Sequence, residues 1–324
     1  MFTTIIFNIL VLCLGIGIVV WGADKFTDGA SSVARRLNMS EMVIGLTVVA
    51  MGTSMPEFVV SFFSALDGKA DMSIGNVIGS NIANILLIVG ISSMLIPMSL
   101  THKLLTRDIL FVLLSSLILV VLSYDGNVSR SDGLILLLCF SMYIIYSYNV
   151  AKYNSDAKAN NGKTYSWSKT VLYSLLGLTC LVGGGQMLVS GASALAISCG
   201  MSERVVGLTI LAVGTSLPEL ATSIVAARKG SKGLAFGNAI GSNLFNVFFV
   251  LGASATIYPL SIQGISVLDW VTLVGSGVIL LVFGGTGYKI TKTEGIIMVS
   301  IYLLYLIALA LKWQITWNFQ SFSI

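Results

Sequence analysis

The sequence predicts an all-α multi-pass membrane protein with ten transmembrane helices in two inverted five-helix repeats. Three observations predict this class: the composition, a succession of apolar runs, and a pair of motifs that occurs twice. Of the 324 residues, 56% are hydrophobic and only 10% are charged, and the mean hydropathy is +0.92. This is far above the range of soluble proteins. We therefore expect a single membrane-embedded unit without a separate soluble domain.

The apolar runs define the ten expected spans, because each is long enough to cross a hydrocarbon core of about 30 Å. They lie near residues 4–23, 42–66, 72–97, 109–124, 132–150, 170–190, 204–227, 234–259, 265–285 and 295–312. The first span lacks the basic start and short apolar core of a cleavable signal peptide. We therefore expect it to remain as a helix.

Lysine and arginine residues are distributed unequally between the two faces that ten spans define. One set of alternate loops holds fourteen of them, and the other set holds four, namely Lys69, Arg130, Arg204 and Lys312. By the positive-inside rule the fourteen face the cytoplasm and both termini face the other side of the cell (inner) membrane. The net charge of +4 thus reflects topology, and no nucleic-acid partner is expected.

Two long motifs occur twice at one constant offset. GLTVVAMGTSMPE at residues 45–57 returns as GLTILAVGTSLPE at 207–219, and GNVIGSNIANILLIVG at 75–90 returns as GNAIGSNLFNVFFVLG at 237–252. The offset is 162 residues, half the chain. Because each half holds five spans, an odd number, the second copy crosses the membrane in the opposite sense. Transporters use such inverted repeats to build one site at mid-membrane.

The expected domain organisation follows from this repeat. Residues 1–150 form the first five-helix repeat, 151–169 a cytoplasmic linker, and 170–324 the second repeat. The linker contains a GKT triplet, but alanine at position 157 replaces the glycine that a phosphate-binding loop needs five residues earlier. No nucleotide partner is therefore expected.

The second and seventh spans each carry one alanine and three residues with oxygen-bearing side chains at positions i, i+3, i+4 and i+7, which lie along one helical face. The two sets are Ala50, Thr53, Ser54 and Glu57, and Ala212, Thr215, Ser216 and Glu219. Pro56 and Pro218 directly precede the two glutamates and lack an amide hydrogen, so the carbonyls four residues before them lose their helical partners. We therefore expect both helices to be broken beside a glutamate.

The third and eighth spans add a second polar face with a spacing of four residues. Its members are Asn76, Ser80 and Asn84, and Asn238, Ser242 and Asn246. All are hard oxygen donors, the type that calcium, magnesium and sodium prefer over thiolate or imidazole.

Only Glu57 and Glu219, among fourteen acidic residues, lie well inside apolar spans. A carboxylate at a helix centre costs about 2.5 to 3.5 kcal/mol, and a bound cation offsets that cost. The pair carries a charge of −2, which one divalent ion, two or more sodium ions, or two protons would balance. Exchange between these loads is therefore the expected function.

With both copies of G-x-T-x-x-A-x-G-T-S-x-P-E and G-N-x-I-G-S-N, the chain resembles the cation/calcium exchanger superfamily, in particular its prokaryotic sodium/calcium exchanger branch. The resemblance implies an antiporter with alternating access through sliding first and sixth helices. It also implies that Glu57 and Glu219 bind both calcium and sodium. It implies that Asn84 completes the centre and that the carbonyls of Ala50 and Ala212 bind outer sodium ions. It also implies ligands from the hydroxyl groups or nearby carbonyls of Thr53, Ser54, Ser80, Thr215, Ser216 and Ser242.

Position 246 departs from the family pattern, because this chain has asparagine where well-known sodium/calcium and potassium-dependent members carry aspartate. The departure leaves the counter-ion open between sodium and protons. The proton/calcium branch typically has a glutamate soon after its G-N pair, where this chain reads GSN, and this favours sodium. A cation channel fits less well, because a charged pair between two broken repeats suits an occluding carrier.

An enzyme is not expected, since Ser54 and Ser216 have no general base other than a glutamate on their own helix. No cofactor and no particular oligomer are implied. The expected partners are membrane lipids and the transported calcium and sodium ions.

Overall fold

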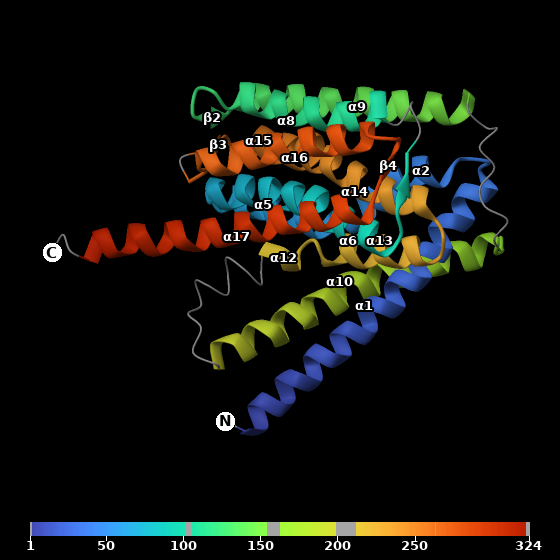
Figure 1. Cartoon of the computed structure of the whole chain (residues 1–324), viewed down its shortest axis with the longest axis horizontal. Helices are drawn as coiled ribbons and strands as arrows, with labels where there is room; N and C mark the ends of the chain where they lie inside the picture. The colour runs from blue at the N-terminus through green and yellow to red at the C-terminus, as the bar shows by residue number, and fades with distance from the viewer. Residues whose placement is uncertain (1, 101–104, 154–162, 199–211, 263, 322–324) are drawn as a thin grey trace.

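The computed structural model describes residues 2–100, 105–153, 163–198, 212–262 and 264–321, and within these ranges the chain is mostly helical (Figure 1). Its first half contains α1 (Phe2–Arg36), α2 (Glu41–Ile44), η1 (Gly45–Val49), α3 (Ala50–Thr53), α4 (Met55–Leu66), α5 (Ala70–Ile82), η2 (Ala83–Val89), α6 (Gly90–Leu95), β1 (Met98–Ser99), η3 (Leu105–Ile109), α8 (Leu110–Leu122), β2 (Asn127–Val128) and α9 (Arg130–Tyr153). Its second half contains α10 (Trp167–Ser198), α12 (Ala212–Gly214), α13 (Leu217–Arg228), α14 (Lys232–Leu244), η5 (Phe245–Leu251), α15 (Gly252–Ile257), β3 (Leu260–Ser261), α16 (Val267–Gly285), β4 (Lys289–Ile290) and α17 (Lys292–Ser321). The η segments are π-helical.

The second half repeats the elements of the first at the same offset of 162 residues. The series α5, η2 and α6 returns as α14, η5 and α15 with every boundary shifted by that number, and α4 returns as α13. The short strands pair between the halves, β1 with β4 and β2 with β3, both antiparallel. The repeated motifs therefore fold into repeated structure, and two small sheets join the halves.

Membrane-spanning length is met, among the described residues, by seven helices, or by eight if the bent helix through α2, α3 and α4 counts as one span. The fourth expected span corresponds to η3 and α8, which together run from Leu105 to Leu122. Part of the seventh expected span, residues 204–211, lies outside the described residues. The chain is an integral membrane protein.

Helix α1 is longer than predicted. The apolar run predicts an end near residue 23, whereas the helix continues to Arg36. Its polar end is satisfied by protein contacts, because Arg35 and Arg36 donate to the carbonyls of Lys163 and Tyr165 at 2.6 and 2.7 Å. Hydropathy marks where apolar residues end, and this helix carries polar turns beyond that point.

Helices α1 and α10 lie side by side along one edge of the molecule and run in opposite directions (Figure 1). Glycines allow the two backbones to approach closely. A Cβ atom on Gly22 would lie 2.9 Å from the carbonyl oxygen of Gly177, and one on Gly15 would lie 3.0 Å from that of Gly184. Gly177 and Gly184 are the counterparts of Gly15 and Gly22 at the repeat offset. The pair is therefore related by a local two-fold axis.

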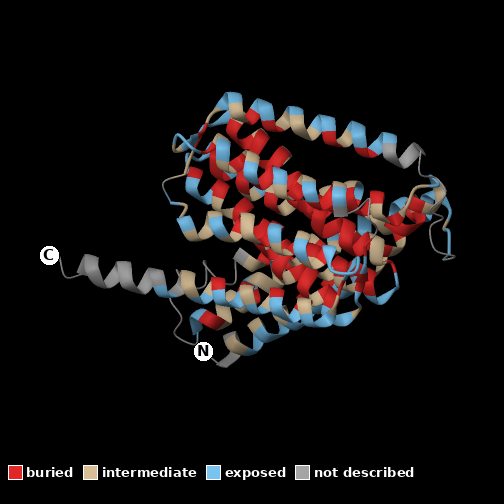
Figure 2. Cartoon of the chain, turned by 45° about the horizontal axis from the view of Figure 1, so that its top comes forward, coloured by how far each residue is buried: buried red, intermediate tan, exposed pale blue. Residues whose placement is uncertain are grey.

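The core lies in the middle of the bundle, and Figure 2 shows buried residues concentrated in the inner helices. In α14 every residue from Leu234 to Leu244 is buried. Large apolar side chains such as Phe7 and Leu138 are exposed on the outer helices, at 63% and 61%. This is the pattern of a bundle whose outer surface faces lipid and whose interior holds the polar groups.

We predict that Gly22→Ala lowers the midpoint of thermal unfolding in detergent. The added methyl group meets main-chain atoms of α10, which must shift, and overpacking of this kind costs about 1 to 3 kcal/mol. The matched control is Gly17→Ala on the same helix, where an added Cβ has no atom within 4 Å. An equal loss of stability in both variants would contradict the close approach of α1 and α10.

Candidate cation site

The site forms where two helices are interrupted. Helical geometry stops at Ser54 between α3 and α4, where the helix bends by 48°. The backbone angles of Ser54 and its counterpart Ser216 agree closely, with φ of −84° and −86°. Pro56 and Pro218 then lie in the first turns of α4 and α13, where a missing amide hydrogen is tolerated. The predicted breaks are confirmed, and each new helix begins just before a glutamate.

Glu57 and Glu219 are both fully buried, and each is bound by the opposite half of the chain. The Ser54 hydroxyl donates to Oε1 of Glu219 at 2.7 Å, and the Ser216 hydroxyl donates to Oε1 of Glu57 at 3.2 Å. The two bonds are counterparts at the repeat offset. The two carboxylates therefore meet inside the bundle, and each lies within hydrogen-bond distance of the turn that precedes the other.

Asn76 and Asn238 fix the backbone around these turns. The Asn238 amide donates to the carbonyl of Glu219 at 3.2 Å and to the hydroxyl of Ser223 at 3.0 Å, and its oxygen lies 3.0 Å from the Thr53 hydroxyl. Asn76 makes the counterpart contacts, including one of 3.3 Å to the carbonyl of Glu57. Both residues belong to the polar face predicted for the third and eighth spans. The structure shows that they brace the broken helices from the neighbouring helix.

Several buried polar atoms at this place have no hydrogen-bond partner. They are Oε2 of Glu57, Oε2 of Glu219, Oγ of Ser80, Oγ of Ser242, both amide atoms of Asn84 and Oδ1 of Asn246. Buried polar groups are almost always paired, and an unpaired one costs about 1 to 3 kcal/mol. Nearly all these atoms are oxygens suited to hard cations. The arrangement can hold a cation, which supplies the missing partner to several of them at once.

The two asparagines of this set lie where α5 and α14 give way to the π-helical segments η2 and η5. Asn246 donates to the side chain of Asn81 at 3.2 Å, and Asn81 donates to the carbonyl of Asn243 at 3.2 Å. Asn81 therefore links the two halves directly. The spacing of residues along one helix does not reveal this contact, because it joins helices from different halves of the chain.

The two alanines were predicted to bind ions through their main-chain carbonyls. The Ala50 carbonyl accepts the amide of Ser54 at 3.0 Å, as a helical carbonyl does. Ala212 begins α12. A third carboxylate is not part of the site: the described residues contain no group of three or more His, Cys, Asp or Glu side chains that would hold a metal ion.

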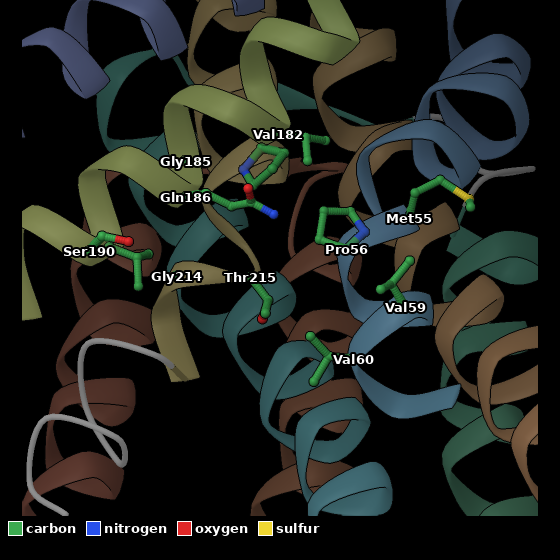
Figure 3. Close-up of a pocket in the computed structure, with 12 residues that line it drawn as sticks. Met55, Pro56, Val59, Val60, Val182, Gly185, Gln186, Ser190, Gly214 and Thr215 are labelled. Atoms are coloured by element: carbon green, nitrogen blue, oxygen red, sulfur yellow. The ribbon is translucent and has the colours of Figure 1, made fainter. Parts of the chain in front are cut away.

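A cavity of about 460 Å³ reaches this region from the side of α10. Its wall is mostly apolar, and Figure 3 shows Gln186 extending from α10 toward Pro56, with Thr215 nearby. Pro56 and Pro218, from both helix breaks, line it. The cavity therefore gives access to the turns that carry the glutamates. A buried pair of carboxylates at the breaks of two membrane helices is typical of a membrane carrier of cations.

Comparisons with known proteins agree with this class. The family described as sodium/calcium exchanger protein matches residues 7–149 and 169–311. The chain is 34% identical to the sodium/calcium exchanger MaX1 of Methanosarcina acetivorans, over 93% of this chain and 98% of the relative. It is 37% identical to the inner membrane protein YrbG of Escherichia coli, over 76% and 79% of the two chains.

The fold is also similar to a solved structure of the sodium-calcium exchanger NCX_Mj soaked with 2.5 mM Na+ and 0.1 mM Ca2+. The TM-score is 0.81 at 32% identity, covering 94% of this chain and 98% of that one. The chain belongs to the sodium/calcium exchanger family. It is accordingly a cation/calcium antiporter of the membrane and not an enzyme.

We predict that calcium stabilises the protein and that Glu57→Gln or Glu219→Gln removes the effect. Calcium at about 100 times its Kd adds about 2.7 kcal/mol of stability, which raises the unfolding midpoint in detergent. The control is Glu41→Gln, which changes another buried glutamate outside the site; this glutamate accepts from Ser231 and lies 3.8 Å from Arg35, so the control also shows what loss of a buried carboxylate charge does elsewhere. If calcium stabilises the Glu57→Gln variant as much as the unaltered chain, the glutamates are not its ligands.

Proposed function

We propose that this protein exchanges calcium for sodium across the membrane by alternating access. The observation that carries the proposal is the crossed pair of bonds from Ser54 to Glu219 and from Ser216 to Glu57. It brings one carboxylate from each half to a single buried place, and each keeps one oxygen without a partner. The names of the relatives MaX1 and NCX_Mj, both sodium/calcium exchangers, support sodium as the counter-ion.

In this proposal Glu57 and Glu219 are the ligands that calcium and sodium share. Their combined charge of −2 is balanced by one calcium ion or by two or more sodium ions, so the two loads compete for the same oxygens. The other proposed ligands are Thr53, Ser54, Ser80, Asn84, Thr215, Ser216, Ser242 and Asn246, with the carbonyls of Ala50 and Ala212 for outer sodium ions. An empty site leaves two buried charges uncompensated, which disfavours a crossing without cargo.

The proposed architecture has ten transmembrane helices in two inverted repeats, residues 1–150 and 170–324, joined by a cytoplasmic linker at 151–169. Both termini face away from the cytoplasm, as the placement of lysine and arginine indicates. The antiparallel α1 and α10 support the inversion. The antiporter acts in the cell membrane.

Proton/calcium exchange is the second candidate, and Asn246 is the observation that favours it. Its amide donates to Asn81, so this position adds no negative charge where related exchangers carry aspartate. The site charge then remains −2, which two protons on Glu57 and Glu219 neutralise as completely as two sodium ions do. The choice between the two counter-ions depends on the gradient that drives calcium.

We predict that an outward sodium gradient drives calcium into proteoliposomes that contain the purified protein. Uptake of radioactive calcium is measured with sodium inside and choline outside, and again with an equal pH gradient and no sodium. Sodium-dependent uptake is expected, and Glu57→Gln should reduce its rate at least about tenfold, because half of the site charge is lost.

Glu41→Gln serves as the control in the same assay and should transport normally. Calcium uptake that follows the pH gradient alone would select proton exchange. Flux that ignores both gradients would contradict the proposal, because an antiporter couples the two movements.

A further inference from the structure

An ion cluster ties α1 to the end of α13. The ammonium group of Lys229, just after α13, lies 2.7 Å from a carboxylate oxygen of Asp24 and 2.7 Å from one of Asp28. It also donates to the main-chain carbonyl of Asp24 at 2.8 Å. These side chains are 25 to 39% exposed, so the cluster is partly shielded from water. One lysine therefore makes three contacts with two turns of α1.

The counterparts of these residues in the other half carry no such cluster. At the repeat offset of 162 residues, Asp24 corresponds to Gln186, Asp28 to Ser190 and Lys229 to Asp67. Gln186 and Ser190 are exposed and line the cavity beside α10 (Figure 3). Asp67 lies near Lys69 in its own loop, at 3.7 Å. The ion cluster is thus confined to one of two otherwise equivalent places.

The two places also differ in how far they are open. Val60 and Val189 line the cavity and are half-buried. Their counterparts Thr222 and Thr27, on α13 and α1, are 0% and 1% exposed. Helices α1 and α13 are packed against each other. A cavity therefore lies beside the helix breaks on the α10 side and reaches Thr215, whereas the corresponding place on the α1 side is closed.

The closed side is more polar than the open one. The hydroxyl groups of Thr27 and Thr222 are buried and have no hydrogen-bond partner, whereas their counterparts Val189 and Val60 have no polar side-chain atom. Thr222 lies one helical turn beyond Glu219. Unpaired hydroxyls are costly in a permanent interface, but they suit a surface that meets water or ions when α1 moves away from α13.

We propose that Asp24, Asp28 and Lys229 form a latch that holds α1 against α13 and closes the path past Thr27 and Thr222. The three residues are positioning residues for transport, since they act on the helices and not on the ions. Opening the Lys229 side requires the latch to break, whereas the described part of the chain has no ion pair that joins α10 to α4 at the corresponding place. The latch therefore favours the conformation in which the cavity side is open. This inference rests on the proposed alternating access.

The latch predicts an asymmetric effect of Lys229→Met. Apparent affinity at a face is reduced by the fraction of molecules that are not open to it. Loss of the latch raises the small fraction open on the Lys229 side about three- to tenfold, a range set by partly exposed ion pairs. The calcium concentration for half-maximal uptake from that side should fall by the same factor. From the cavity side it should change less than twofold, because most molecules remain open there.

The experiment measures calcium uptake in proteoliposomes of each orientation, whose sidedness is fixed by labelling with a membrane-impermeant reagent. Lys229→Arg should keep both values near those of the unaltered chain, since it preserves the charge. Lys69→Met is the matched control: it removes a lysine that is 64% exposed and pairs at 3.7 Å in the corresponding loop.

A mirror variant gives a test that damage to the fold does not imitate. Asp67→Lys, Gln186→Asp and Ser190→Asp, combined with Lys229→Met, move the cluster to the cavity side. The half-maximal concentration should then rise at the cavity side relative to Lys229→Met alone and fall further at the Lys229 side.

Equal changes at both faces, or the same shift in Lys69→Met, would overturn the latch. So would an unchanged value at the Lys229 side. These outcomes are separate from failure of the proposed function, which appears as uncoupled calcium flux in the unaltered chain.

Discussion

Two carboxylates buried in a hydrocarbon environment are the constraint on which the rest of the structure depends. Glu57 and Glu219 are fully buried in a chain whose outer helices expose apolar side chains. Each is placed in the first turn of a new helix, where the main-chain dipoles favour negative charge. Each also accepts a hydroxyl from the other half. The helix breaks, the serines and the repetition of the motif in both halves all help to make this burial tolerable, and each carboxylate keeps one oxygen without a hydrogen-bond partner.

The same constraint explains why the inner helices α5 and α14 carry so many buried amides. The side-chain amides of Asn76 and Asn238 donate to the carbonyls of the two glutamates and so hold the first turns of α4 and α13 against the neighbouring helices. Asn81 joins the halves near the π-helical segments, and such segments are frequent at functional sites. Bracing of this kind holds the glutamates in place and leaves Oε2 of each without a hydrogen-bond partner.

Much of the candidate site was predictable because the same motifs occur in both halves of the sequence. The offset of Glu57 and Glu219, the proline breaks and the face formed by Ser80 and Asn84 all follow from spacing, and the breaks are confirmed. The predicted end of the first span near residue 23 was wrong, since α1 continues to Arg36, because hydropathy detects lipid contact and not helix continuity. The crossed bond from Ser54 to Glu219 was not predictable, since it depends on how two halves meet in space. The ligand roles remain predictions.

The four short strands have a mechanical consequence. Pairing β1 with β4 and β2 with β3 cross-links the two halves at residues that flank the long outer helices. None of these four strands is next to α1 or α10 in the sequence. We expect the cross-linked part to behave as a stationary scaffold against which α1 and α10 travel as a shuttle. The stationary part would then determine which ions bind, and the movement of α1 and α10 would determine only the side of the membrane on which they are released.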